Sequence, residues 1–154
     1  MKTGHQLDKI DYKILTILQK GGRTKRSHIA EATGLSIPSI SDRLKRLEGD
    51  GVISKYSAIV NPYKLGFDVT AFIIVTVDSS EHYDAFLDTV TNTNEIIECH
   101  AITGEGTHML KVRVKNTKSL EELLSTIQSW GGVSKTMTRV VLSSHKETMT
   151  LPVE

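Results

Sequence analysis

The spacing of apolar residues changes character at residues 61–66, and this change constrains the fold more than any other feature of the sequence. Before these residues apolar side chains recur every three or four positions, as on one face of a helix. After them the apolar side chains begin to alternate, as in a strand. The intervening letters NPYKLG favour a break in regular structure. We therefore predict an α+β protein with a helical domain at residues 1–60, a linker at 61–68 and a second domain at 69–154.

The first domain is expected to contain three helices. Asp8 is placed to cap the first helix, Thr24 or Ser27 to cap the second, and Ser36 to cap the third. Gly34 is expected to close the second helix in the left-handed conformation. The third helix carries a single apolar stripe, formed by Ile37, Ile40, Leu44 and Leu47.

The segment after the third helix, residues 52–60, is predicted to be extended, with a hairpin tip near Lys55 and Tyr56. Two short helices joined at a tight turn, followed by such a hairpin, predict a winged helix-turn-helix.

Charge is distributed unevenly between the two expected domains. Residues 1–60 contain 11 Lys and Arg against 6 Asp and Glu, a formal charge of +5, whereas residues 61–154 carry −4. A basic module favours a polyanionic partner, and an acidic module repels one. The two domains are therefore expected to have different partners.

The third helix is the candidate reader of double-stranded DNA. With its apolar stripe turned inward, Ser36, Ser39, Arg43 and Arg46 are expected to face outward, flanked by Asp42 and Lys45. Small side chains allow close approach to base edges, and an arginine can bridge guanine O6 and N7 or grip a phosphate. The predicted DNA-binding residues are Lys25, Arg26, Ser36, Pro38, Ser39, Asp42, Arg43 and Arg46. A basic helix face that is merely solvated remains the alternative.

The second domain is predicted to follow a βαββαβ order. Strands are expected at residues 69–77, 96–102, 108–114 and 133–142, with one helix around 83–90 and another opened by a capping box at Ser119 and Glu122. This order is typical of a ferredoxin-like domain. Two helices cover only one face of such a sheet, so Phe72 and Ile74 on the other face favour dimerisation. Coverage by the linker or the tail is the alternative.

The loop at residues 103–107 is a candidate ligand site. Its two glycines leave backbone N–H groups open to a carboxylate, and Glu105 can meet an ammonium group. The candidate effector contacts are Gly104, Glu105, Gly106, Thr107 and His108, with Thr136 and Thr138 on the last strand. An ordinary hairpin turn is the alternative interpretation.

Catalytic and metal-binding motifs are not found in the sequence. It contains no HExxH, no paired CxxC, and no set of nucleophile, base and orienting group, so we predict no enzyme, no metal and no cofactor. The single cysteine, Cys99, cannot form an internal disulfide, which suits a reducing cytoplasm. No apolar run approaches the roughly 18 residues that a membrane span requires.

Motifs in both halves resemble the Lrp/AsnC family of transcription regulators, also called feast/famine regulatory proteins. The first half carries "LDKIDYKILTILQKGGRTKRSHIAEATGLSIPSISDRLKRLEGDGVI", and the second carries "TGEGTHMLKVRV". The resemblance covers about residues 6–148. The chain departs from the family pattern at Thr107 and His108, where the family commonly has an acidic residue followed by an aromatic one. This departure bears on which ligand fits.

The resemblance implies a DNA-binding regulator that dimerises through its second domain and assembles further, into octamers or higher forms. It also implies that a small amino acid binds at the contact between dimers, near the glycine-containing loop, and shifts assembly or DNA affinity. The alternative function is a ferredoxin-like ligand-binding or enzymatic module whose helical head mediates protein contacts.

Overall fold

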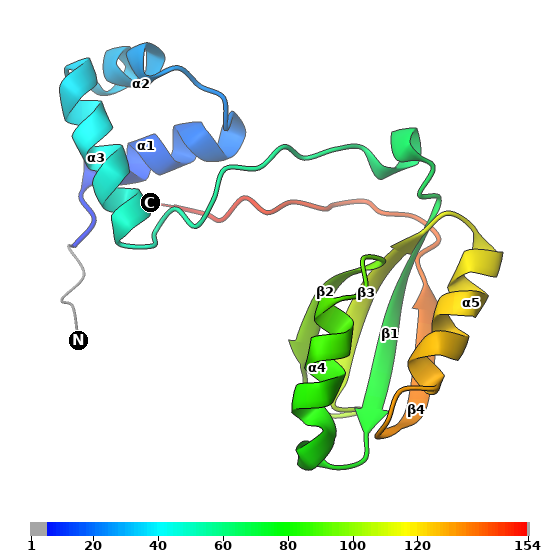
Figure 1. Ribbon diagram of the computed structural model, residues 1–154. Helices are drawn as coiled ribbons and strands as arrows, with labels where there is room; N and C mark the ends of the chain where they lie inside the picture. The colour runs from blue at the N-terminus through cyan, green and yellow to red at the C-terminus, as the bar shows by residue number, and fades with distance from the viewer. Residues whose placement is uncertain (1–5, 154) are drawn as a thin grey trace. The chain divides into compact units, whose positions relative to one another are not determined.

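The computed structural model describes residues 6–153, and these residues form two compact units (Figure 1). The first unit holds residues 6–60 together with 146–153, and the second unit holds residues 61–145. The sequence had assigned the end of the chain to the second domain, whereas the structure packs it with the first unit. Residues 1–5 and 154, at the ends of the expected domains, lie outside the described residues.

Three helices form the first unit: α1 (Lys9–Lys20), α2 (Arg26–Thr33) and α3 (Ile37–Gly49). Asp8 caps α1 as predicted, because its carboxylate accepts the N–H groups of Ile10 and Asp11. Gly34, at φ +74°, closes α2, and the Ser36 hydroxyl caps α3. The prediction that Thr24 or Ser27 caps α2 was wrong. Lys25 occupies the N-cap position, and its side chain makes no capping hydrogen bond.

The core of the first unit joins all three helices. Its fully buried side chains include Ile14 from α1, Ile29 from α2, and Ile40 and Leu47 from α3. The stripe predicted on α3 is therefore the buried face, although Ile37 at its start remains about half exposed. The helix-turn-helix is held by apolar burial on this one face, which leaves the opposite face of α3 available.

The segment after α3 does not form the predicted hairpin. Residues 54–60 are exposed, and they belong to no helix or strand. Lys55 and Tyr56 therefore do not form a hairpin tip. Tyr56 instead donates a hydrogen bond of 2.9 Å from its hydroxyl to Glu48 Oε1, which ties this segment to the end of α3.

The end of the chain, residues 146–153, is called here the C-terminal tail. The Gln19 side chain of α1 makes two hydrogen bonds to the backbone of Leu151: its Nε2 donates to the carbonyl at 3.1 Å, and its Oε1 accepts the N–H at 2.7 Å. Val153 packs against the core of the first unit. These contacts make the tail part of the first unit.

The second unit has the predicted βαββαβ order around one antiparallel sheet. Its elements are η1 (Pro62–Leu65), β1 (Val69–Val77), η2 (Ser80–His82), α4 (Tyr83–Thr91), β2 (Ile96–Ala101), β3 (His108–Val114), α5 (Thr117–Gln128) and β4 (Val133–Val140). The strand order β2-β3-β1-β4 is that of a ferredoxin-like sheet. Asn116, rather than the predicted Ser119, caps α5.

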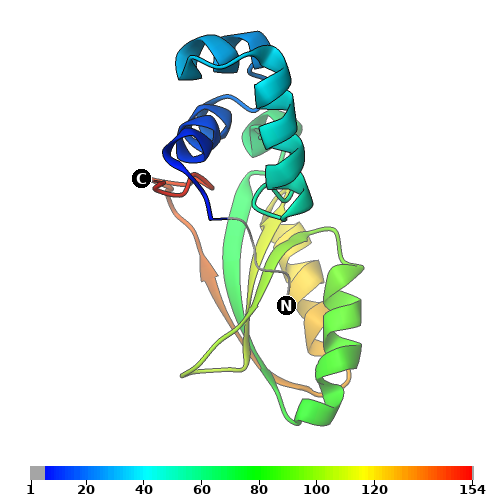
Figure 2. The same ribbon diagram turned by 90° about the vertical axis from the view of Figure 1, so that its left-hand side faces the viewer.

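Helices α4 and α5 cover the same face of this sheet (Figure 2). The alternation along β1 buries Ala71, Ile73, Val75 and Val77 against those helices. Phe72 and Ile74 lie on the other face, called here the open face, as the sequence predicted. Within the described residues of this unit, no helix covers the open face.

Candidate functional site

Helix α3 is tied to α1 by two arginines and two carboxylates. Arg43 Nη1 lies 2.7 Å from Asp8 Oδ2 and 2.7 Å from Asp11 Oδ1. Arg46 Nη2 donates to both Asp11 oxygens at 3.0 Å. The Asp11 side chain is fully buried, and it also accepts the N–H of Asp8 as part of the α1 capping box. We call these four side chains the α1–α3 ion-pair network.

This network corrects the orientation expected for Arg43 and Arg46. Both were predicted to face outward, but their guanidinium groups turn toward the start of α1, and their side chains are only 21 % and 33 % exposed. The hydrogen bonds that Arg43 donates to Asp8 and Asp11 raise the pKa of Arg43. The backbone N–H of Asp11, and then Arg43, lower the pKa of Asp8. The arginines thus set the orientation of α3 against α1.

The face of α3 opposite its core carries Pro38, Ser39, Asp42 and Lys45, all exposed. We call these four residues the outward stripe. Asp42 and Lys45 form no ion pair with any residue that the structure describes, and Ser39 shares a 2.8 Å hydroxyl contact with Ser36. Lys45 was considered only as a flanking residue, yet its position and charge make it part of this surface.

Lys25 and Arg26 lie at the start of α2 and are exposed, as expected. Arg26 Nη1 is 3.4 Å from Ser41 Oγ, so its side chain extends toward α3. The start of a helix favours anions, and these two cations reinforce that preference. Together with the outward stripe they form a polar surface on the helix-turn-helix.

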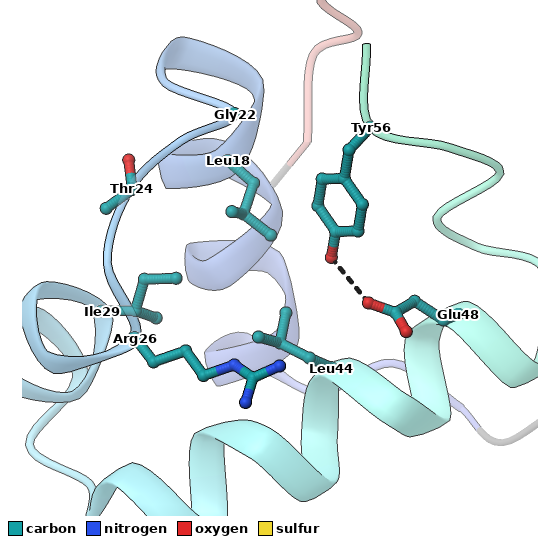
Figure 3. A pocket seen from close by; sticks show the side chains of 8 residues that line it. All are labelled: Leu18, Gly22, Thr24, Arg26, Ile29, Leu44, Glu48 and Tyr56. Atoms are coloured by element: carbon teal, nitrogen blue, oxygen red, sulfur yellow. Dashed lines mark hydrogen bonds between the residues drawn. The ribbon is translucent and has the colours of Figure 1, made fainter.

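A pocket of about 220 Å³ lies on another flank of α3, also within the first unit (Figure 3). Figure 3 shows Tyr56 and Glu48 joined by their hydrogen bond on one side of it, with Arg26 on another. Leu18, Ile29 and Leu44 give it an apolar lining. Burial and the neighbouring Glu48 raise the pKa of Tyr56 to about 12, so its hydroxyl stays a donor.

The candidate effector loop, residues 103–107, joins β2 to β3. Gly104 and Gly106 adopt φ values of +95° and +79°, a region that favours glycine. A Cβ on Gly106 would overlap Ile74 Cγ2, which places this part of the loop against the open face of the sheet. The N–H groups of Gly104, Glu105 and Gly106 donate to no other described residue, so they are free for a ligand.

Thr107 and His108 were expected to contact a ligand at the loop, but the structure turns their side chains elsewhere. The Thr107 hydroxyl donates to the Val75 carbonyl at 3.2 Å and accepts the Val77 N–H at 3.0 Å, so it extends the sheet. His108 is 2 % exposed and packs its ring 4.9 Å from those of Tyr83 and Phe86 in α4. Burial lowers the pKa of His108. Its imidazole therefore belongs to the core beneath α4.

Thr136 and Thr138 also lie on the face away from the loop glycines. They are paired in register with Val75 and Ile73, whose side chains face the helices. Gln128 of α5 donates to Thr136 Oγ1 at 2.9 Å, which confirms this direction. The structure thus separates these two threonines from the other candidate contacts.

Lys135 is a neighbour of the loop that the sequence did not single out. Its Nζ lies 3.5 Å from Glu105 Oε1, and both side chains are more than half exposed. No local pattern links the two residues, since 30 positions separate them in the chain. The loop therefore offers free N–H groups, a carboxylate and an ammonium group.

Residues 6–153 contain neither a candidate metal-binding cluster nor a candidate membrane-spanning helix. Among residues 6–153, no group of three or more His, Cys, Asp or Glu side chains could hold a metal ion. Over the same described residues, no helix is both long and apolar enough to span a bilayer.

Comparison with known protein families accounts for both units. Residues 7–54 match a family model described as a winged helix-turn-helix DNA-binding domain. Residues 70–151 match the model of the Lrp/AsnC ligand binding domain. The chain belongs to the Lrp/AsnC family. Its first unit is thus a DNA-binding domain, which decides against the alternative of a helical head for protein contacts.

Relatives of this Lrp/AsnC protein match over nearly its whole length. HTH-type transcriptional regulator FL11 of Pyrococcus furiosus is 40 % identical over 148 residues, covering 96 % of this chain and 97 % of its own. The leucine-responsive regulatory protein of Escherichia coli strain K12 is 33 % identical, covering 99 % and 95 %. These relatives are transcription regulators, which agrees with the expectation that the chain is not an enzyme.

A solved structure has the same fold as this Lrp/AsnC protein. A transcriptional regulator of Neisseria meningitidis, determined in complex with L-Met, superposes with a TM-score of 0.91 at 32 % identity, covering 96 % of this chain and 97 % of its own. The predicted combination of a winged helix-turn-helix and a ferredoxin-like domain is confirmed by these matches.

Proposed function

We propose that this protein is a sequence-specific regulator of transcription whose assembly or DNA affinity responds to a small amino acid bound between dimers. Family membership makes it a DNA-binding regulator with a ligand-binding domain. The observation that carries the finer proposal is the pairing of a free polar helix face in a basic domain with a loop of free N–H groups in an acidic one.

The proposed DNA contacts are the outward stripe of α3 in the major groove, with Lys25 and Arg26 at the phosphates. Support comes from the exposure of these side chains and from the formal charge of +5 over residues 1–60. Arg43 and Arg46 hold α3 in position through the ion-pair network rather than reading bases. Because DNA is the partner, the proposed location is the cytoplasm.

The proposed dimer forms through the open face of the sheet, with further association to an octamer or a higher form. Support comes from Phe72 and Ile74, which one chain leaves only half-buried on that face. Two copies related by a two-fold axis would present two α3 helices to two half-sites about one turn of DNA apart.

The proposed effector is a small amino acid at the loop of residues 103–107, where two dimers meet. Its carboxylate would accept hydrogen bonds from the free N–H groups and lie near the Lys135 ammonium group. Its own ammonium group would meet the Glu105 carboxylate. The relative from Neisseria meningitidis was determined with L-Met, which supports this chemical class of ligand.

A mobility-shift assay with genomic fragments, at two salt concentrations, tests the proposal. We expect selected fragments to bind in preference to scrambled ones, and we expect affinity to fall steeply with salt as phosphate contacts are lost. A parallel screen of the common amino acids should find one that changes oligomer size in light scattering or changes DNA affinity. No duplex binding at low salt would refute the DNA proposal, and no response to any amino acid would refute the effector proposal.

A further inference from the structure

The outward stripe of α3 has an acidic residue at its centre. Ile40, Leu44 and Leu47 are buried on one side of the helix, and Asp42 lies on the opposite side. Its neighbours one turn away along that side are Pro38 and Lys45. A carboxylate at this position is unexpected, because phosphates would repel it from DNA.

Neither arginine of α3 pairs with Asp42. Arg46, four residues on, is positioned to pair with it, but the Arg46 guanidinium is held by both oxygens of Asp11. Arg43 is held by Asp8 and Asp11 in the same way. The ion-pair network thus withdraws two cations and leaves the Asp42 carboxylate exposed and unpaired among the described residues.

A carboxylate can only accept hydrogen bonds, which limits what it can contact in a major groove. Guanine presents only acceptors there, and thymine presents an acceptor and a methyl group. Adenine places the N7 acceptor beside its amino group, so it suits an amide better than a carboxylate. Cytosine presents its N4 amino group alone. The base edge that complements Asp42 is therefore that of cytosine.

We propose that Asp42 is a specificity-determining residue, which accepts a hydrogen bond from the N4 amino group of a cytosine in each half-site. The inference rests on the proposed insertion of α3 into the major groove. Asp42 rejects the other bases at that position, and phosphate repulsion disfavours any register of α3 that brings the carboxylate near the backbone.

Selection of bound duplexes from a randomised pool tests this role in the full-length protein. The wild type is expected to select cytosine at one position of each half-site. Asp42→Asn should move that preference from cytosine to adenine, because an amide complements adenine N6 and N7. Asp42→Ala should lose the preference, with discrimination at that base pair falling roughly 5- to 100-fold.

Asp50→Asn is the matched control. Asp50 is also exposed, but it lies at the C-terminal end of α3, so the same change in charge should leave base preference unaltered. Both residues are on the surface, so thermal melts of all variants should agree with the wild type.

The outcomes distinguish this inference from the proposed function. If Asp42→Asn keeps the cytosine preference, or raises affinity equally for every sequence as Asp50→Asn does, Asp42 does not read a base, although the protein remains a sequence-specific regulator. If the wild type selects no sequence at all, both the proposed function and this inference are overturned.

Discussion

The α1–α3 ion-pair network makes a sharp prediction for Asp11→Asn. This isosteric change removes the charge that two guanidinium groups share, and it turns one acceptor oxygen into an NH₂ group that faces a donor. The folded state then keeps Arg43 and Arg46 close together without their buried counter-charge. We therefore expect the first unit to lose stability while the second unit is unchanged.

The magnitude follows from burial. Removing one partner of a buried ion pair costs about 3–5 kcal/mol when the remaining charge cannot reach water. Here Arg43 and Arg46 keep 21 % and 33 % of their side-chain area exposed, so partial rehydration lowers the expected loss to about 2–3 kcal/mol. For a small domain that loses about 1 kcal/mol of stability per molar urea, the unfolding midpoint should fall by roughly 2–3 M.

Two signals separate the units in a urea titration of the full-length protein. Far-UV circular dichroism follows the helices of both units, whereas fluorescence of the single tryptophan, Trp130, follows only the second unit, against whose core it packs. A shift seen in dichroism but not in fluorescence therefore belongs to the first unit. Asp50→Asn serves as the control, since loss of an exposed charge changes stability by less than about 0.5 kcal/mol. A midpoint for Asp11→Asn no lower than that of Asp50→Asn would refute the reasoning.

Three further predictions concern other parts of the chain. Burial lowers the pKa of His108 below its ordinary value of 6.5, so the unfolded state binds the proton more tightly. The stability of the second unit should therefore fall as pH drops through 6.5. His108→Gln should flatten this dependence in urea titrations followed by Trp130 fluorescence. Gly106→Ala should destabilise the second unit by about 1–3 kcal/mol, because the added methyl overlaps β1, whereas Gly104→Ala, with open space around it, should cost less; equal losses would contradict the clash. Gln19→Ala should release the C-terminal tail, seen as faster hydrogen exchange in the tail but not in β1; unchanged exchange would show that the side-chain hydrogen bonds do not hold it.

The ion-pair network also changes how basic residues on a reader helix are interpreted. Arg43 and Arg46 supply much of the positive charge of α3, yet their guanidinium groups are occupied inside the domain. Charge counted along a sequence therefore overstates what a DNA duplex would meet. The side chains exposed on the opposite face of α3, which we propose meet the duplex, are instead Ser39, Asp42 and Lys45.

Local patterns in the sequence were sufficient for most of the fold. The apolar stripe of α3, the alternation along β1 and the left-handed Gly34 between two helices each depend on neighbours a few positions away. Such signals survive without tertiary information because helix and strand periods repeat over short stretches. The same alternation places His108 with the buried Leu110 and Val112, so its inward direction was encoded in the sequence as well.

Only the tertiary structure decided where the functional side chains point. Arg43 and Arg46 meet Asp11 across 32 and 35 residues of chain, and Lys135 meets Glu105 across 30. The C-terminal tail returns to Gln19 across 132 residues. A charge can turn toward solvent, DNA or a buried carboxylate, and residue spacing does not distinguish these choices. The outcome depends on which opposite charge the fold brings within hydrogen-bond distance, because a buried carboxylate without a partner is too costly to persist.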